Sequence, residues 1–180
     1  KYEYLNEDGK NVSFFSNLRT PQTEIYNTAD KGEYYLLEVD EPLVLPVDTK
    51  VRKRAAPPAG EHKVLGWDAA GVVEAVGAQV TLFKPGDPVF GGRSGALAEY
   101  VLIAEDRALA HKPANLPFGE AAAVPVAAIT ALQAIRDKGA VRSGHKVLVN
   151  GASGGVGTFA VQIAKAYGAD VTGVCSTRNV

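Results

Sequence analysis

The sequence predicts two regions of different fold class, a β-rich region followed by an α/β unit with parallel strands. Short apolar runs alternate with glycine and proline turns over residues 64–111, which is typical of a β-barrel or β-sandwich. After Lys112-Pro113 the chain becomes rich in Ala, Ile and Leu. A strand, a helix and a second strand then follow within about 30 residues, which indicates a βαβ unit with a right-handed crossover. We place the boundary between the two regions near residues 112–118.

Composition excludes several classes of function. The 180 residues include 19 Lys and Arg, 20 Asp and Glu, and one cysteine, Cys175. A net charge of −1 provides no general attraction to nucleic acid or to an anionic membrane. A single cysteine excludes an intramolecular disulfide and a zinc site built on several thiolates. The longest near-apolar run, 121–135, is too short to span a bilayer, and residues 1–20 hold no apolar leader segment. We therefore expect a cytoplasmic location, with no nucleic acid or membrane partner.

The elements of the β-rich region follow from local patterns. Residues 1–33 carry little pattern, whereas Tyr34–Val39 is typical of a strand bounded by Gly32 and Pro42. Residues 51–61 place Arg52, Lys53 and Arg54 before a stretch rich in Ala and Pro, which predicts an exposed loop. Three clustered charges without an aromatic residue favour a solvated surface over a phosphate-binding patch. Further strands are expected at 71–77 and 98–103, with a turn at 84–87.

The second region begins with helices and continues with the βαβ unit. Pro125 divides residues 118–139 into two helical pieces. Strands are predicted at 146–150 and 170–175, with an amphipathic helix at 155–167 between them. The sequence Gly-Ala-Ser-Gly-Gly-Val-Gly at 151–157 joins the first strand to this helix. The unit therefore carries a glycine-rich loop at the amino end of a helix.

Such a loop is suited to binding phosphate. Glycines permit close approach of the backbone, and a helix amino end presents free N–H groups and positive charge. The register is G-x-G-x-x-G with Ala152 in the first position, and Gly157 lets the helix press on the strand. Because strand, loop, helix and second strand all occur where a dinucleotide site requires them, we interpret the loop as one. The alternative is a glycine-rich turn that binds nothing.

Two rival phosphate loops do not fit. A Walker loop requires Gly-Lys-Ser/Thr at its end, whereas Gly157 is followed by Thr158 and Phe159. The spacing of Gly151, Gly155 and Gly157 also matches short-chain dehydrogenases, but in those chains the unit comes first. Here 145 residues precede the strand and 23 follow Gly157. Position rather than spacing excludes that class.

The end of the second strand predicts which dinucleotide binds. An NAD site usually has an acidic residue there, bonded to the ribose 2′-hydroxyl. This chain has Ser176-Thr177-Arg178 instead. A hydroxyl and a guanidinium can bind a 2′-phosphate through charge-assisted hydrogen bonds, so we predict NADP(H) as the cofactor. The alternative is that Arg178 is only a surface arginine.

These residues resemble the medium-chain dehydrogenase/reductase superfamily, and within it the zinc-free, NADPH-dependent quinone oxidoreductases. The supporting motifs occur in family order at Pro46–Asp48, Leu65–Gly77, Phe83–Asp87, Gly95–Tyr100, Ala121–Pro125, Thr130–Leu132 and the glycine loop. The resemblance is good over 46–180 and hardly extends to 1–40. It implies a GroES-like β-barrel domain over 1–115 and the first part of a Rossmann domain over 116–180. It also implies a cofactor in the cleft between the domains and a homodimer.

The resemblance also concerns zinc. In the zinc-dependent alcohol dehydrogenases of the superfamily a Cys and a His hold the catalytic metal, and the corresponding positions here are Leu45 and Trp67. The four-cysteine structural lobe cannot exist with one cysteine. The three histidines lack ligand spacing; they are His62, His111 and His145. We therefore predict no metal site.

The function that the resemblance implies is direct hydride transfer from NADPH to a quinone or an α,β-unsaturated carbonyl. By this resemblance the pyrophosphate is lined by Ser153, Gly154, Gly155 and Val156. Ser176 and Arg178 meet the 2′-phosphate. Thr130 lies against the nicotinamide, or alternatively bonds the backbone of its own helix. No catalytic proton donor is assigned, and Asp48 and Tyr100 are polar candidates that are equally compatible with structural roles.

Two departures from the family, Leu45 and the incomplete Rossmann sheet, keep other functions open. Family members commonly carry Asn where this chain has Leu45, which favours a non-catalytic NADPH-binding or structural protein as one alternative. A zinc-free alcohol dehydrogenase is another. Two parallel strands cannot complete a Rossmann sheet, so we expect these 180 residues to be the N-terminal part of a longer enzyme.

Overall fold

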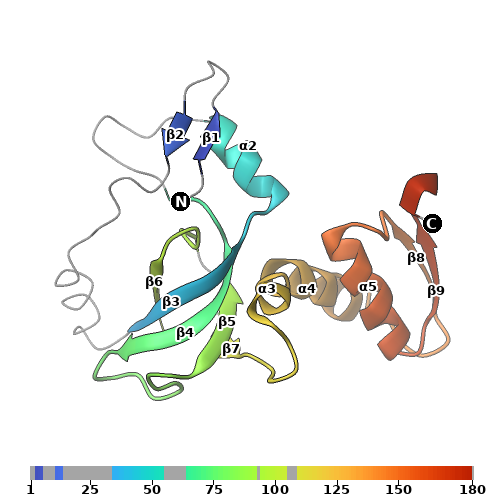
Figure 1. Ribbon diagram of the computed structural model, residues 1–180. Coiled ribbons are helices and arrows are strands. Elements are labelled where there is room, and N and C mark those ends of the chain that lie inside the picture. Colours follow the sequence, from blue (N-terminus) through green and yellow to red (C-terminus); the bar gives the residue numbers. More distant parts are fainter. Residues whose placement is uncertain are drawn as a thin grey trace. The chain divides into compact units, whose positions relative to one another are not determined.

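The computed structural model describes residues 3–5, 11–13, 34–54, 64–92, 94–104 and 109–179 (Figure 1). The chain divides into two compact units, Lys1–Ala123 and Val124–Val180. The predicted domains at 1–115 and 116–180 stay a prediction. The helix that follows Pro117 packs within the first unit.

The first unit is built on a five-stranded sheet in which every pair of neighbours is antiparallel. The strand order is β6-β3-β4-β5-β7. The strands are β3 (Tyr34–Leu43), β4 (Asp68–Val76), β5 (Pro88–Gly92), β6 (Tyr100–Ala104) and β7 (Leu109–His111). A separate antiparallel pair is formed by β1 (Glu3–Leu5) and β2 (Asn11–Ser13). The strands predicted at 34–39, 71–77 and 98–103 are thus confirmed as β3, β4 and β6, with shifted ends.

Strand β3 is longer than predicted because it continues past Pro42. Its first half, Tyr35 to Glu38, pairs with β6 on one side and with β4 on the other. Beyond that point β6 no longer pairs with it, and Pro42 lies opposite Ala69 of β4. Proline has no N–H to donate and is tolerated where one side of a strand needs no ladder partner. The proline therefore does not end the strand.

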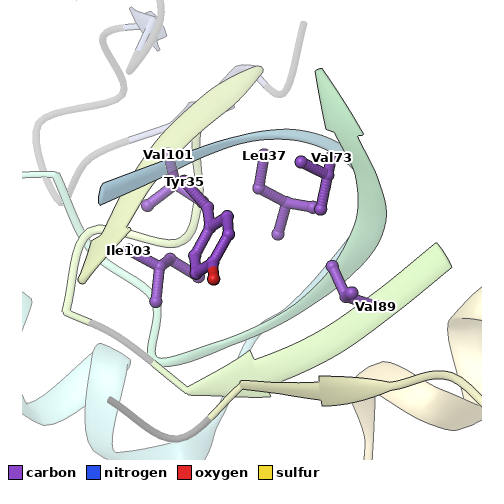
Figure 2. Close-up of a cluster of buried hydrophobic side chains, with 6 residues drawn as sticks. All are labelled: Tyr35, Leu37, Val73, Val89, Val101 and Ile103. Carbon is purple, nitrogen blue, oxygen red and sulfur yellow. The ribbon is translucent and has the colours of Figure 1, made fainter. Parts of the chain in front are cut away.

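The core of the first unit lies on one face of this sheet. Its buried side chains alternate along β3 and β6, as a period of two residues requires. They are Tyr35, Leu37, Val73, Val89, Val101 and Ile103, and Figure 2 shows them gathered between the curving strands. Removing each of the aliphatic side chains from water stabilises the fold by about 1.5–3 kcal/mol.

Tyr35 connects this core to a loop. Its hydroxyl oxygen accepts hydrogen bonds from the backbone N–H groups of Leu82 and Phe83, at 3.0 and 3.3 Å. Its ring meets the ring of Phe83 edge to face, with 5.2 Å between the centroids. The loop leads directly into the predicted turn at Lys84–Asp87, in which the N–H of Asp87 donates to Lys84 O at 3.1 Å. The buried phenol thereby holds the β4–β5 connection.

One prediction for the first unit is wrong. An exposed loop is expected at Val51–Arg54, but these residues form the end of helix α2 (Pro46–Arg54). Pro46 occupies the first helical position, where its missing N–H is not needed. The carboxylate of Asp48 accepts the N–H of Leu45 at 2.8 Å, which satisfies a donor at the helix start. Residues 55–61 of the expected loop lie outside the described residues.

Helix α3 (Phe118–Ala122) packs on the sheet of the first unit. Ala121 and Ala122 are buried against Ala70 of β4, with partly buried Leu43, Phe90 and Phe118 around them. The Nζ of Lys112 donates to Leu116 O at 2.6 Å and lies 4.9 Å from the centroid of the Phe118 ring. These small and apolar contacts fasten the helix to the sheet.

The second unit contains the predicted βαβ arrangement. Its elements are α4 (Pro125–Leu132), η1 (Gln133–Lys138), β8 (Lys146–Asn150), α5 (Gly155–Ala166), β9 (Asp170–Val174) and η2 (Thr177–Asn179). Strands β8 and β9 pair in parallel, from Lys146 opposite Asp170 to Asn150 opposite Val174. This confirms both strands, the crossover helix, and the break at Pro125.

The helices of this unit pack through alanines. Ala131, Ala160 and Ala164 are buried between α4 and α5, and Ile135, Val141 and Val149 complete the cluster.

The six residues of η1 form a π-helix that local patterns do not predict. It is followed closely by Ala140, whose φ is +43°. In the described part of the chain no helix is both long and apolar enough to cross a membrane.

Candidate functional site

The glycine loop joins the carboxyl end of β8 to the amino end of α5. The N–H groups of Gly151 and Ala152 both donate to Val174 O, the last carbonyl of β9, at 2.9 Å each. The N–H of Gly154 donates to Gly151 O at 3.0 Å, which closes the turn. The loop is therefore fastened to the end of the neighbouring strand before the helix begins.

Gly157 sets how closely α5 approaches the loop. A Cβ atom at this position would fall well inside contact distance of Gly151 O and 2.9 Å from the Cα of Ala152. Both obstacles are backbone atoms, so a side chain here would push the helix away from the loop. The close approach that Gly157 permits is thus with the glycine loop, at Gly151 and Ala152, whereas the prediction named the strand.

The exposed rim of the loop carries the four residues predicted to line a pyrophosphate. Ser153, Gly154, Gly155 and Val156 are all exposed. Gly154 is the N-cap of α5 and no side chain caps the helix there. The N–H groups in the first turn of a helix have no acceptor within the helix, and the macrodipole adds positive charge. The rim can therefore receive an anionic oxygen from solvent.

The turn after β9 lies against this loop. The Nδ2 of Asn179 donates to the Oγ of Ser153 at 3.0 Å, and the two residues are 26 positions apart. Asn179 ends the short helix η2, which contains Arg178, and Ser176 comes just before it. Ser176 and Arg178 are both exposed. The structure thus brings the predicted 2′-phosphate residues to the same edge as the glycine loop.

Thr130 lies on the exposed side of α4. Its hydroxyl donates to Val126 O one turn earlier, at 2.6 Å, which is the hydrogen bond expected of a threonine that bonds its own helix. The oxygen still has lone pairs with which to accept. The position of Thr130 beside a nicotinamide stays a prediction.

In the first unit, Asp48 binds Leu45, one of the two positions compared with zinc ligands, and Gly66, which precedes the other, Trp67. This carboxylate is 2% exposed, and it accepts the N–H of Leu45 at 2.8 Å and of Gly66 at 2.9 Å. Leu45 and Trp67 therefore flank one buried group. The indole-bearing residue Trp67 is 40% exposed. Asp48 therefore has a structural role, because it accepts hydrogen bonds from two backbone N–H groups. The sequence is compatible with either a structural or a catalytic role for this residue.

The position of Gly66 requires glycine. Its φ is +95°, a left-handed conformation that side chains disfavour. A Cβ on it would lie 2.6 Å from the backbone nitrogen of Leu97. Its own carbonyl accepts the N–H of Gly95 at 2.9 Å. Three segments of the first unit thus meet around Asp48 and Gly66.

The other polar candidates make local contacts within their own units. Tyr100 opens β6 opposite Glu38 of β3. The ring of His111 packs edge to face on Phe83, with 4.8 Å between centroids. His145 precedes β8, and its carbonyl accepts the N–H of Asp170 at 2.8 Å. His62 lies outside the described residues. Within the described ranges, no three His, Cys, Asp or Glu side chains gather as a metal-binding group.

The ion pair of Arg136 and Asp137, outside the candidate site, shifts the pKa of Asp137. Arg136 donates to Asp137 from Nε to Oδ1 at 2.6 Å and from Nη2 to Oδ2 at 3.1 Å. These hydrogen bonds hold the pKa of the Asp137 carboxyl below its usual range. Both side chains are exposed on η1, and neither residue is among those predicted to bind the cofactor.

The residue that sequence reasoning missed is Asn179. It follows the predicted 2′-phosphate residues directly, but its contact with Ser153 depends on how the end of β9 lies beside the glycine loop. The only cue in the sequence is an amide side chain just after a strand, which is common in turns. Nothing local associates it with Ser153.

Comparison with known proteins agrees with this structure. The alcohol dehydrogenase GroES-like domain family matches residues 32–114. A quinone oxidoreductase of Sus scrofa is 39% identical over 165 residues, covering 87% of this chain and 48% of that protein. The human mitochondrial NAD(P)H oxidoreductase RTN4IP1 is 44% identical over 120 residues, covering 62% of this chain and 30% of that protein. The chain thus spans half or less of the length of these relatives.

Solved structures give the same result. The crystal structure of Escherichia coli quinone oxidoreductase complexed with NADPH matches with a TM-score of 0.72 and 31% identity. The match covers 82% of this chain and 46% of that one. The predicted fold class, a GroES-like domain followed by part of a dinucleotide-binding domain, is confirmed. The chain belongs to the medium-chain dehydrogenase/reductase superfamily.

Proposed function

We propose that this chain forms part of a zinc-free oxidoreductase that transfers hydride from NADPH to a quinone or an α,β-unsaturated carbonyl. The observation that carries the proposal is that the turn after β9 is hydrogen-bonded to the glycine loop at one edge of the second unit. There the glycine loop, the amino end of α5 and the turn after β9 lie together, linked by the Asn179–Ser153 hydrogen bond. A dinucleotide needs its pyrophosphate and its adenosine ribose recognised at such adjoining places.

The residues present fit a dinucleotide. No atom lies within 4 Å of a Cβ added at Gly155, so the backbone there is open to a ligand. Gly157 keeps the helix end close to the loop, and the exposed Ser153 hydroxyl stands beside it. When bound, the cofactor supplies the hydride; the protein supplies binding, orientation and exclusion of water. In this proposal the first-turn amides and Ser153 bind the pyrophosphate.

The preference for NADPH rests on Ser176 and Arg178. Residues 175–179 contain no carboxylate that would repel a 2′-phosphate. Arg178 is exposed on η2, where its guanidinium can turn toward an anion in solvent. The similar quinone oxidoreductase of Escherichia coli is complexed with NADPH, which supports this choice. Thr130 is proposed to lie near the nicotinamide.

The substrate class and the absence of zinc rest on residue types and on relatives. Leu45 and Trp67 cannot bind zinc, and the pig relative is named a quinone oxidoreductase. A homodimer and a cytoplasmic location stay predictions, and the human relative is named mitochondrial. Leu45 also favours the non-catalytic alternative, because family members commonly carry Asn in its place.

The experiment is a titration and a turnover assay on the full-length protein. We expect NADPH to bind and to be oxidised with one or more members of a panel of quinones and enones, with or without a chelator. Binding without any turnover would select the non-catalytic alternative. Steady oxidation of simple alcohols with NADP⁺, insensitive to chelator, would select an alcohol dehydrogenase. Loss of turnover on chelation would show that the reaction needs a metal.

A further inference from the structure

Asn179 contacts the glycine loop although no part of the predicted site includes it. Its Nδ2 donates to Ser153 Oγ at 3.0 Å. We propose that Asn179 is a positioning residue of the dinucleotide site, which acts by directing the Ser153 proton toward the pyrophosphate. This inference rests on the proposed function, because it assigns a role within that site.

The chemistry of a hydroxyl makes the direction of this hydrogen bond important. Serine has one proton to donate and two lone pairs with which to accept. In the observed contact the Asn179 amide donates, so the Ser153 proton is not used by Asn179 and remains available on the exposed side of the loop. A phosphate oxygen accepts such a proton in a charge-assisted hydrogen bond. A hydroxyl that already accepts from an amide is also polarised into a stronger donor.

Both partners are held by their own backbones. The N–H of Asn179 donates to Ser176 O at 2.8 Å, and the Cys175 thiol approaches Asn179 O at 3.7 Å. On the other side, the turn that contains Ser153 is closed by the Gly154 N–H on Gly151 O at 3.0 Å. The side-chain contact therefore joins two segments whose positions are already set by backbone hydrogen bonds. Its role is to orient the hydroxyl rather than to create the turn.

This role predicts a pattern that separates Asn179 from its neighbour Arg178. Pyrophosphate is common to NADPH and NADH, whereas the 2′-phosphate occurs only in NADPH. A residue that acts through Ser153 must weaken both cofactors by the same factor. A residue that binds the 2′-phosphate must weaken NADPH alone.

The test is a double-mutant cycle on the full-length protein, with the Kd of NADPH and of NADH measured for each variant. We expect Ser153→Ala to weaken both cofactors about tenfold and Asn179→Ala about fivefold, as for hydrogen bonds to a charged group. The double variant should bind about as weakly as Ser153→Ala alone, because Asn179 acts only through Ser153. Gln162→Ala is the matched control, since its amide Nε2 also makes an exposed 3.0 Å bond, to Thr158 O. It should leave both Kd values unchanged.

A second variant reverses the hydrogen bond without removing it. In Asn179→Asp the carboxylate would accept the Ser153 proton, so the contact persists while the proton turns away from the pyrophosphate. We expect binding of both cofactors to fall about twentyfold, with the thermal midpoint of the cofactor-free protein unchanged. In the Ser153→Ala background the same change should weaken binding only about threefold, by charge repulsion alone.

The outcomes separate the two proposals. Effects that multiply in the double variant to about fiftyfold would overturn the role of Asn179 and leave the proposed function standing. Wild-type affinity in Asn179→Asp would do the same. If the wild-type protein binds neither NADPH nor NADH, the proposed function fails and this inference fails with it.

Discussion

The carboxylate of Asp48 accepts the backbone N–H of Gly66 at 2.9 Å across 18 residues of sequence. The same carboxylate accepts the N–H of Leu45, so one buried side chain joins the start of α2 to the segment before β4. Gly66 can take part because it lies at φ +95°. This junction holds together the part of the first unit that contains both Leu45 and Trp67.

Removing this carboxylate should destabilise the first unit. Asp48→Ala leaves two backbone donors without an acceptor, and one of them is buried, so we expect the free energy of unfolding to fall by about 3 kcal/mol. Asp48→Asn keeps one acceptor and should lose about half as much. Urea unfolding followed by Trp67 fluorescence measures both, because Trp67 follows Gly66 directly. Glu74→Ala on the exposed side of β4 is the control and should change stability by less than about 0.5 kcal/mol. If Asp48→Ala also changed the free energy of unfolding by less than about 0.5 kcal/mol, the Asp48 hydrogen bonds would not be needed for the stability of the first unit.

Gly157 and Gly155 form a matched pair within one helix turn. Gly157→Ala places a methyl group against backbone of the loop and should reduce stability by about 2 kcal/mol. Gly155→Ala meets no atom within 4 Å, and its folding stability should stay the same or rise by up to about 0.5 kcal/mol. Thermal unfolding of the cofactor-free protein compares the two. Equal losses of stability would contradict the close approach at Gly157.

The same pair also tests the site. Because the space beside Gly155 is the proposed approach of the pyrophosphate, Gly155→Ala should weaken NADPH binding while the protein stays folded. Isothermal titration with NADPH measures this, and unchanged affinity would place the pyrophosphate elsewhere.

Arg178 should decide between the two cofactors. Arg178→Ala removes the proposed charge-assisted contact to the 2′-phosphate, so the Kd of NADPH should rise by about ten- to thirtyfold. The Kd of NADH should change by less than about twofold, since NADH has no charge at that position. Arg142→Ala, at an exposed arginine of the same unit before β8, is the control. A wild-type preference for NADH, or an unchanged NADPH affinity in Arg178→Ala, would contradict the assignment.

The hydroxyl of Tyr35 should contribute to folding stability in addition to its buried ring. Tyr35→Phe keeps the buried ring and the edge contact with Phe83 but removes the acceptor for the N–H groups of Leu82 and Phe83. We expect a loss of about 1.5 kcal/mol, because these donors lie only partly buried. Tyr167→Phe, on an exposed ring after α5, is the control in the same urea experiment. Equal effects of the two changes would mean that solvent replaces the Tyr35 hydroxyl without loss.

Much of the fold follows from local sequence patterns. Alternating apolar residues place Tyr35 and Leu37 on one face of a strand, and the order of strand, glycine loop, helix and strand locates β8, α5 and β9. These patterns succeed because backbone conformation and the side of burial depend on neighbours within a few residues. The helix at 51–54 is missed because its start depends on Asp48, whose carboxylate bonds Leu45 nearby and Gly66 much farther along the chain.

The sequence by itself determined the superfamily, the two regions and the residue types at the edge that we propose binds the cofactor. Tertiary structure alone decided the contacts between distant residues. Asp48 meets Gly66 and Asn179 meets Ser153 across 18 and 26 positions. Such contacts depend on how strands and loops lie beside one another in space, and no periodic pattern records them. They arise only when packing has brought the two backbones within reach of a single side chain.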